Sequence, residues 1–126
     1  MTSIILPWPP KELSPNARHG WKKLAPIKKK YRATCAWECK AQGVKKMDVY
    51  SLHVSITFHP PSNRRQDLDN MLASIKSGLD GVADAIGVDD SNWTITIARG
   101  DVRGCVAVHL AEVPCIQEIE HRGIIT

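Results

Sequence analysis

The sequence predicts an α+β domain in which a single mixed β-sheet carries two main helices, in the order β-α-β-α-β-β. Three observations predict this fold. Residues 49–60 alternate between apolar and polar side chains, as a half-buried strand does. Apolar residues recur with helical spacing from residue 68 onward, and two further strand-like runs lie between 93 and 113. With 126 residues, the chain is long enough for one domain with a real core, 1–126, whose last residues, 114–126, form a peripheral tail.

The N-terminal third predicts a strand, a basic loop and a helix. Residues 3–8 (SIILPW) form the strand, which the following prolines close. Pro, Asn and Gly interrupt residues 11–25, which we expect to be an irregular loop. Residues 26–43 predict the first helix, because its leading proline fits a first turn, Gly43 fits a C-terminal stop and apolar residues recur every four positions.

The next strand and helix follow clear periodicities. In the strand 49–60, the apolar positions point inward, so we expect His53 and His59 at the surface or in a groove, about 20 Å apart and too far to share a metal ion. The helix runs from about residue 68 to 86 and has one buried stripe, Leu68, Leu72, Ile75, Leu79, Val82 and Ile86. Gly78 and Gly81 weaken its middle, which predicts a bend or a close backbone approach there.

The remaining elements are a turn and a pair of strands. Gly87 and the polar residues up to Asn92 predict the turn. Residues 93–113 predict two strands joined by a tight Gly/Asp loop, that is, a β-hairpin.

Charge is unevenly distributed. Residues 1–46 carry 11 basic and 2 acidic residues, residues 47–126 carry 6 basic and 11 acidic residues, and the net charge is +4. This pattern favours a polyanion-binding surface beside a cation-binding one, although lysine-rich surfaces also serve solubility alone. Cations crowd the first two turns of helix 26–43, where they oppose the helix dipole, so a phosphate backbone is a candidate partner. Trp8 and Trp21 either stack on nucleic acid or cover the edge of the core.

Several classes of protein are disfavoured. No apolar run approaches the roughly 20 residues of a membrane span, and the N-terminus does not read as a signal peptide, so we expect a cytoplasmic protein. Four cysteines are present without a CxxC pair, which disfavours zinc and disulfides. Cys35 and Cys39 share one helix face, as small buried thiols do.

The stretch NRRQDLDN (residues 63–70) places Arg64 and Arg65 before Asp67 and Asp69 at the mouth of the second helix. Acidic residues suit helix N-termini, so each aspartate alone has a simple structural explanation. Both carboxylates also fall on one side of an extended segment, from which they can reach one Mg²⁺ ion. An EF-hand is excluded, because apolar residues stand where its loop needs an oxygen ligand and a glycine.

The LPWPP start, the NRRQDLDN motif, the patterned helix ending in DGVADAIGVDD and the closing pair of strands together resemble the RusA family of Holliday junction resolvases. The family consists of small dimeric endonucleases, often encoded by phages or prophages of bacteria. The resemblance implies a RusA-like fold and a role in DNA recombination and repair, with Mg²⁺ as cofactor (Mn²⁺ as a substitute) and no organic cofactor or membrane. The implied substrate is branched double-stranded DNA, four-way junctions above all, cut by paired symmetric nicks.

Carried onto this sequence, the family's essential carboxylates are Asp67, Asp69 and Asp90, with Asp89 as a neighbouring metal ligand. The family's lysine lies four residues after the second aspartate, where this chain has Ala73, and the first lysine is Lys76. Two interpretations of Lys76 are open. It shares a helix stripe with Asp69 and Asp80, so it can touch a scissile phosphate, or it forms an exposed i,i+4 ion pair with Asp80.

The expected DNA-binding residues are basic residues before the motif and in the N-terminal half, namely Arg64, Arg65, Arg18, His19, Lys22, Lys23, Lys28, Lys29, Lys30 and Arg32. A straight helix from Asp69 to Ala85 rises about 24 Å, which separates Asp90 from Asp67 and Asp69. Either the helix bends, or Asp90 enters from the other subunit of a two-fold homodimer, which we favour. The alternatives are a nuclease for other branched DNA, and a protein that binds junctions without cutting them.

Overall fold

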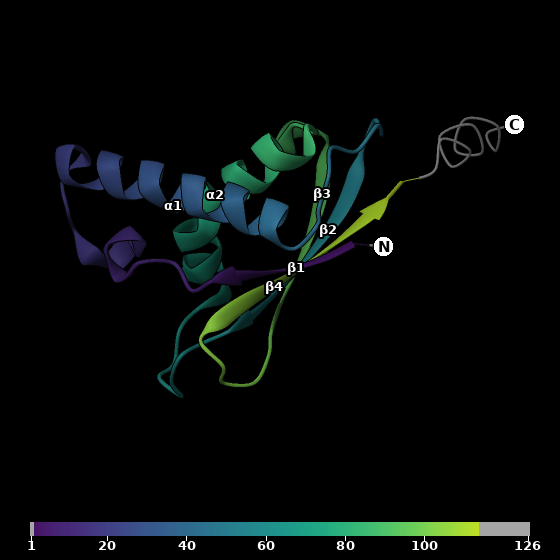
Figure 1. Cartoon of the computed structure of the whole chain (residues 1–126). Helices are drawn as coiled ribbons and strands as arrows, with labels where there is room; N and C mark the ends of the chain where they lie inside the picture. The colour runs from purple at the N-terminus through teal and green to yellow at the C-terminus, as the bar shows by residue number, and fades with distance from the viewer. Residues whose placement is uncertain (1, 114–126) are drawn as a thin grey trace, which may run out of the picture.

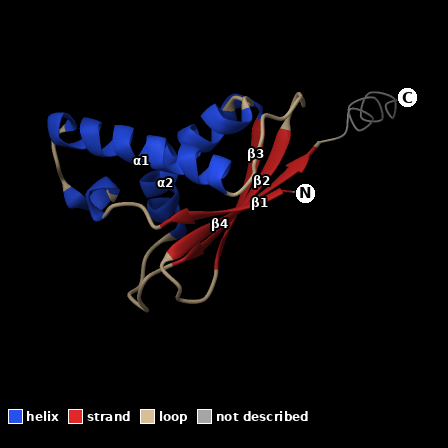
Figure 2. Ribbon diagram, in the orientation of Figure 1, coloured by secondary structure: helices blue, strands red, loops and turns tan. Residues whose placement is uncertain are grey.

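The computed structural model describes residues 2–113, which form a four-stranded sheet with two long helices packed on one of its faces (Figure 1). The α+β class and the order β-α-β-α-β-β are confirmed. The predicted tail 114–126, with Cys115, lies outside the described residues. The elements, coloured by type in Figure 2, are β1 (Thr2–Pro7), η1 (Lys11–Leu13), η2 (Pro15–Ala17), α1 (Trp21–Ala41), β2 (Leu52–His59), α2 (Leu68–Ile86), η3 (Asp90–Asn92), β3 (Trp93–Arg99) and β4 (Cys105–Glu112).

The sheet has the strand order β1-β4-β2-β3. β4 is antiparallel to both β1 and β2, whereas β3 is parallel to β2, with Leu52 opposite Trp93. The predicted β3–β4 hairpin is therefore wrong, because β2 lies between the two strands. Parallel neighbours need a crossover connection, which α2 supplies. The segment 100–104 carries the chain around the end of β2 and is bonded there, with Gly100 N donating to Phe58 O at 2.8 Å.

One face of the sheet packs against the helices and holds the core. The predicted inward positions of β2 are all fully buried, and they lie beside buried residues of β4, which in turn pair with buried residues of β1. His53 is half-exposed, as predicted, and its Nδ1 lies 2.8 Å from Thr94 Oγ1. The prediction that His59 is a surface or groove residue is wrong. His59 is only 8% exposed, because the segment 100–104 folds back over it and brings the Asp101 carboxylate within 2.9 Å of its Nδ1.

Helix α1 begins five residues earlier than predicted, at Trp21, so Pro26 lies inside it. The carbonyl of Gly20 accepts hydrogen bonds from the first turn, and Pro26 costs the helix one further bond. The predicted loop 11–25 is also partly wrong, because it contains η1 and η2. The C-terminal stop is confirmed: Gly43 has φ 83°, and Val44 N donates to Cys39 O at 2.9 Å, as in a Schellman motif.

Helix α2 has the predicted bounds, with Asp67 as N-cap and the left-handed Gly87 after its end. Four residues of the predicted stripe are buried, but Leu68 and Leu72 are only partly buried, and Met71 takes their place in the core at 2% exposure. Leu72 instead lines a groove together with Leu13 of η1 and Pro15 of η2.

The glycines of α2 allow a close approach to α1, which was one of the two predicted possibilities, the other being a bend. A Cβ atom on Gly81 would lie 2.2 Å from the carbonyl oxygen of Arg32, and one on Gly78 would lie 2.6 Å from Tyr31 Cε2. Leu68–Ile86 is one continuous helix, so the close approach, and not a break in the helix, explains both glycines.

The thiols of Cys35 and Cys39 are free and buried, as predicted, and burial raises the pKa of Cys35 to about 12 and that of Cys39 to about 11. Trp8 packs edge-on against Phe58, which confirms the core-edge interpretation for this residue, whereas Trp21 is 75% exposed. Within the part of the chain that the structure describes, no helix combines the length and apolar character that a membrane crossing requires.

Candidate functional site

The N-terminus of α2 presents the two aspartates of the motif to solvent. Asp67 is the N-cap residue, yet its carboxylate accepts no capping hydrogen bond, and Asp69 lies in the first turn. Both residues are exposed, and neither forms an ion pair with another described residue. Their carboxylate oxygens are therefore free to bind a ligand, and the helix dipole favours negative charge at this end.

Asp67 and Asp69 open into two neighbouring hollows. The first, here called the Asp67 hollow, has a volume of about 680 Å³ and is also lined by Arg64, Arg65 and Trp8. The second, the Asp69 groove, has a volume of about 640 Å³. The expectation that both carboxylates lie on one side of an extended segment is wrong, because the helix already begins at Leu68, so Asp69 lies in its first turn and lines a different hollow from Asp67.

The Asp69 groove joins the acidic and basic halves of the sequence. From α2 it is lined by Asp69, Lys76 and Asp80, the stripe that helical periodicity predicts. From the N-terminal region it is lined by three of the predicted DNA-binding residues, Arg18, His19 and Lys28. The groove is therefore a place where a cation-binding and an anion-binding surface meet.

The other predicted DNA-binding residues of this region do not line the groove. Lys22, Lys23, Lys29 and Lys30 are exposed along α1. Arg32 is already engaged, because its Nε and Nη2 donate to the carboxylate of Asp84 at 2.7 and 2.8 Å. This bidentate pair lowers the pKa of Asp84, so both partners are charged at neutral pH.

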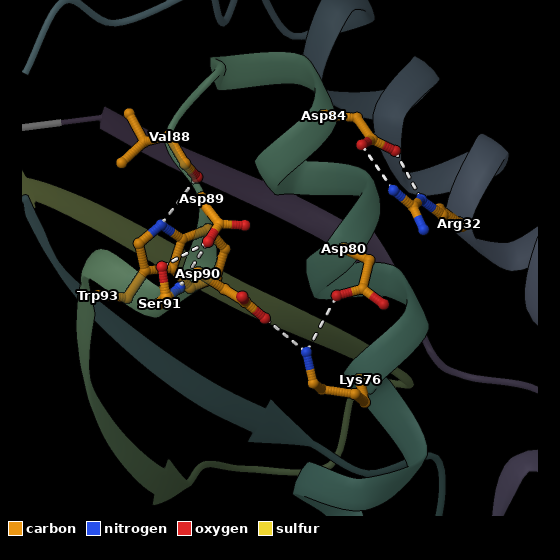
Figure 3. Close-up of polar contacts among 9 residues, drawn as sticks. All are labelled: Arg32, Lys76, Asp80, Asp84, Val88, Asp89, Asp90, Ser91 and Trp93. Carbon is orange, nitrogen blue, oxygen red and sulfur yellow. Dashed lines mark hydrogen bonds and ion pairs between the residues drawn. The ribbon is translucent and has the colours of Figure 1, made fainter.

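Lys76 bridges two aspartates from different elements (Figure 3). Its Nζ donates to Asp90 Oδ2 at 2.5 Å and to Asp80 Oδ1 at 3.0 Å. These hydrogen bonds, to Asp90 first and Asp80 second, raise the pKa of Lys76. The predicted i,i+4 ion pair with Asp80 is therefore present, and a second carboxylate joins it. The catalytic interpretation of Lys76 stays a prediction.

Asp90 does not lie beyond the far end of α2, as the straight-helix calculation assumed. The chain reverses at Gly87 and runs back along the helix, and Trp93 Nε1, which donates to Val88 O at 3.2 Å, helps to hold this turn. Asp90 thereby reaches the middle of α2 at Lys76, which is seven residues, or about 10 Å along the axis, after Asp69. Entry of Asp90 from a second subunit stays a prediction.

Asp89 is occupied as a capping residue. Its carboxylate accepts hydrogen bonds from the hydroxyl and the backbone N–H of Ser91, and these bonds, the hydroxyl's first, lower the pKa of Asp89. Among residues 2–113, no three His, Cys, Asp or Glu side chains lie together as a metal site would need. Of the four predicted ligands, Asp67 and Asp69 fit Mg²⁺ as free, exposed oxygen donors, whereas Asp89 and Asp90 are held by protein groups.

Asp80 was predicted as an ion-pair partner of Lys76 but not as a site residue, and a second residue of this region, Arg99, was not predicted at all. Arg99 donates through Nη2 to the carbonyl oxygen of Gln66, directly before Asp67. This second contact depends on β3 lying parallel to β2, which no local pattern revealed.

Comparison with known proteins assigns no activity. No protein-family model matches the chain. It is 40% identical over 96 residues to a protein of Xylella fastidiosa (strain Temecula1) that bears the name "Uncharacterized protein". The match covers 74% of this chain and 63% of that relative, so the chain spans less than two thirds of the relative's length.

Proposed function

We propose that the protein is a Mg²⁺-dependent endonuclease that resolves four-way DNA junctions, as its resemblance to the RusA family implies. The observation that carries the proposal is the Asp69 groove, where a carboxylate without an ion-pair partner among the described residues stands opposite Arg18, His19 and Lys28. Phosphodiester hydrolysis needs a cation site and a cationic surface for the strand side by side, and this groove supports both. A DNA substrate implies that the protein acts in the cytoplasm of a bacterial cell, and the resemblance to the RusA family implies that a phage or prophage encodes it.

In this proposal, Asp67 and Asp69 hold the metal ion where their two hollows adjoin, at Ser14 and Ser74, with Mn²⁺ as a substitute for Mg²⁺. When bound, the ion neutralises phosphate oxygens and favours attack by water. Lys76, on the same side of α2 as Asp69, stabilises negative charge that develops on the phosphate. The basic residues of α1 and of the segment before it hold the arms of the junction through their phosphates, independently of sequence.

The proposal includes a two-fold homodimer in which Asp90 completes the site of the partner. Within one chain, Lys76 keeps Asp90 about two helical turns from Asp69. Two equivalent sites would also produce the symmetric nicks that junction resolution needs.

Mixing two inactive variants tests this arrangement. If Asp90 acts in the partner's site, a heterodimer of Asp67→Asn and Asp90→Asn subunits regains one intact site. Random mixing should then restore about a quarter of the wild-type sites, since half of the dimers are mixed and each has one of its two sites intact. If Asp90 acts within its own chain, every site stays defective and no activity returns.

A second candidate is a protein that binds junctions without cutting them. The observation that favours it is the ion pair of Lys76 with Asp90, together with Ala73 at the family's lysine position. A nuclease for flaps or forks uses the same chemistry on a different branched substrate.

Incubation of the purified protein with end-labelled four-way junctions, flaps and forks in Mg²⁺ or in Ca²⁺ distinguishes these candidates. We expect paired nicks in the four-way junction in Mg²⁺ and binding alone in Ca²⁺. Asp67→Asn should reduce nicking at least 100-fold, a loss typical of a group that acts in the transition state, without preventing binding. Asp48→Asn is the matched control, because it removes the same charge from an exposed residue outside the hollows and should cut normally. Binding in both ions without nicks would support the non-catalytic candidate.

A further inference from the structure

We propose that Arg99, together with Arg64 and Arg65, forms an arginine pocket that binds a phosphate group beside Asp67. The inference rests on the proposed function for one point only, that the phosphate belongs to a DNA strand. It adds a binding residue from β3, Arg99, which the sequence did not reveal.

The three arginines line one hollow of about 560 Å³ at the end of β3 and the loop before α2. Within the described residues, none of these three arginines has a carboxylate partner, whereas Arg32 and Arg103 are each paired with an aspartate. Arginine guanidinium groups bind phosphate through two parallel hydrogen bonds, and three of them around one hollow create a strong preference for an anion.

The one acidic residue that lines the pocket is engaged elsewhere. The carboxylate of Asp101 accepts from Arg103 Nε at 3.1 Å and lies 2.9 Å from His59 Nδ1. These contacts keep the pKa of Asp101 below its usual range. Because Asp101 is committed to these partners, it does not neutralise the three arginines.

The sheet and the loop together fix the position of Arg99. It is the last residue of β3, in register with the fully buried Phe58. Its Nη2 donates to the carbonyl oxygen of Gln66, so the guanidinium is held against the residue that precedes Asp67. A guanidinium has five N–H donors, and this single bond leaves others free for a ligand.

The arginine pocket and the Asp67 hollow share a wall. Arg64, Arg65, Ser62 and Gln66 line both. A DNA strand that places one phosphate in the arginine pocket can therefore continue into the hollow that holds Asp67. In this arrangement, Arg99 is a binding and positioning residue, which sets the register of the strand relative to the carboxylates.

Arg99→Gln tests the pocket. Lys46→Gln is the matched control, because it removes the same charge from a residue at the opposite end of α2, near Gly87. The first arm titrates inorganic phosphate and follows the arginine Nε–Hε signals by NMR. We expect wild-type protein and Lys46→Gln to bind phosphate equally, and Arg99→Gln to bind it at least tenfold more weakly. The four-way junction, added in Ca²⁺, should displace the phosphate.

The second arm measures junction affinity against salt concentration. Loss of one phosphate contact should reduce the slope of log K against log [salt] by about 1 in Arg99→Gln. Arg99→Lys keeps the charge without the two-pronged geometry, so it should retain the slope but lose phosphate affinity, and it serves as a second variant if Arg99→Gln folds poorly.

Equal phosphate affinity and equal slope in Arg99→Gln and wild type would overturn the pocket. Phosphate binding that the junction does not displace would overturn the DNA strand as its ligand in favour of a small free phosphate. Neither arm depends on strand cleavage, so a protein that binds here but never nicks would contradict the proposed enzyme and leave the pocket standing.

Discussion

Replacing Gly81 by alanine should separate the two helices that form the Asp69 groove. The new Cβ would lie 2.2 Å from the carbonyl oxygen of Arg32 and 3.1 Å from Ala36 N. Carbon atoms normally approach other heavy atoms to about 3.5 Å, so α1 must move away by about 1 Å. The obstructing atoms belong to the backbone of a helix, so no rotamer change can relieve the contact.

Two opposing effects set the magnitude of the change. Alanine gains up to about 1 kcal/mol over glycine in helix propensity. Overpacking of this kind costs typically 1–3 kcal/mol, and a gap of about 1 Å forfeits up to half of the dispersion energy of the contacts along the helix pair. We expect the steric effect to dominate and the free energy of unfolding to fall by about 2 kcal/mol, or roughly 6–10 °C in Tm for a domain of this size.

Thermal and urea unfolding followed by circular dichroism measure this change. Ser77→Ala is the matched control, because it lies one turn earlier on the same helix and adds no atoms. The hydroxyl of Ser77 is buried and has no hydrogen-bond partner in the described structure, so its removal should leave stability unchanged or raise it. If Gly81→Ala is as stable as wild type, or behaves like Ser77→Ala, the close approach of the two helices is refuted.

Four further predictions concern titration and ion pairs. Burial raises the pKa of Cys35 from 9.0 to about 12 and that of Cys39 from 9.0 to about 11. Both thiols should therefore resist alkylation by iodoacetamide at pH 8 in the native protein and react in urea, which mass spectrometry of the peptides would show. The folded state keeps protons that the unfolded thiols release above about pH 9. The free energy of unfolding should therefore be highest below about pH 9 and fall as the pH rises towards 12. Urea unfolding midpoints at pH 8 and pH 10 would detect this fall. Asp84→Asn, which removes a half-exposed partner of Arg32, should leave the urea midpoint nearly unchanged at high salt. Lys76→Met should lower the free energy of unfolding by less than about 1 kcal/mol, because the ion pairs of Lys76 are exposed. It should nevertheless reduce junction cleavage more than 100-fold in the labelled-junction assay. A loss of cleavage no larger than the loss of folded protein would contradict the proposed role of Lys76.

Local signals predicted the elements that depend on local interactions. The bounds of α2 follow from an N-cap aspartate and a left-handed glycine, and the burial of β2 follows from strict alternation. The start of α1 was missed because Pro26 resembles a first helical residue, whereas the backbone of Gly20 sets the real start.

Interactions between distant segments could not be predicted in this way. A Gly/Asp loop between two strand patterns is typical of a hairpin, but β3 pairs with β2 through the α2 crossover, so the loop instead covers the end of β2 and buries His59. The same crossover brings Arg99 to Gln66. The position of Asp90 was misjudged for a related reason, since the reversal at Gly87 returns the chain along α2.

The close helix contact also explains how a charge asymmetry in the sequence becomes a site. Gly81 touches α1 at Arg32, and Lys28 lies one helical turn before that contact, while Asp80 directly precedes Gly81. Lys28 and Asp80 therefore lie near the same crossing, on the walls of the Asp69 groove. Side chains larger than hydrogen at Gly81 would hold the basic helix away from the acidic stripe. The small size of one glycine is thus a requirement for the groove in which we propose that metal and DNA meet.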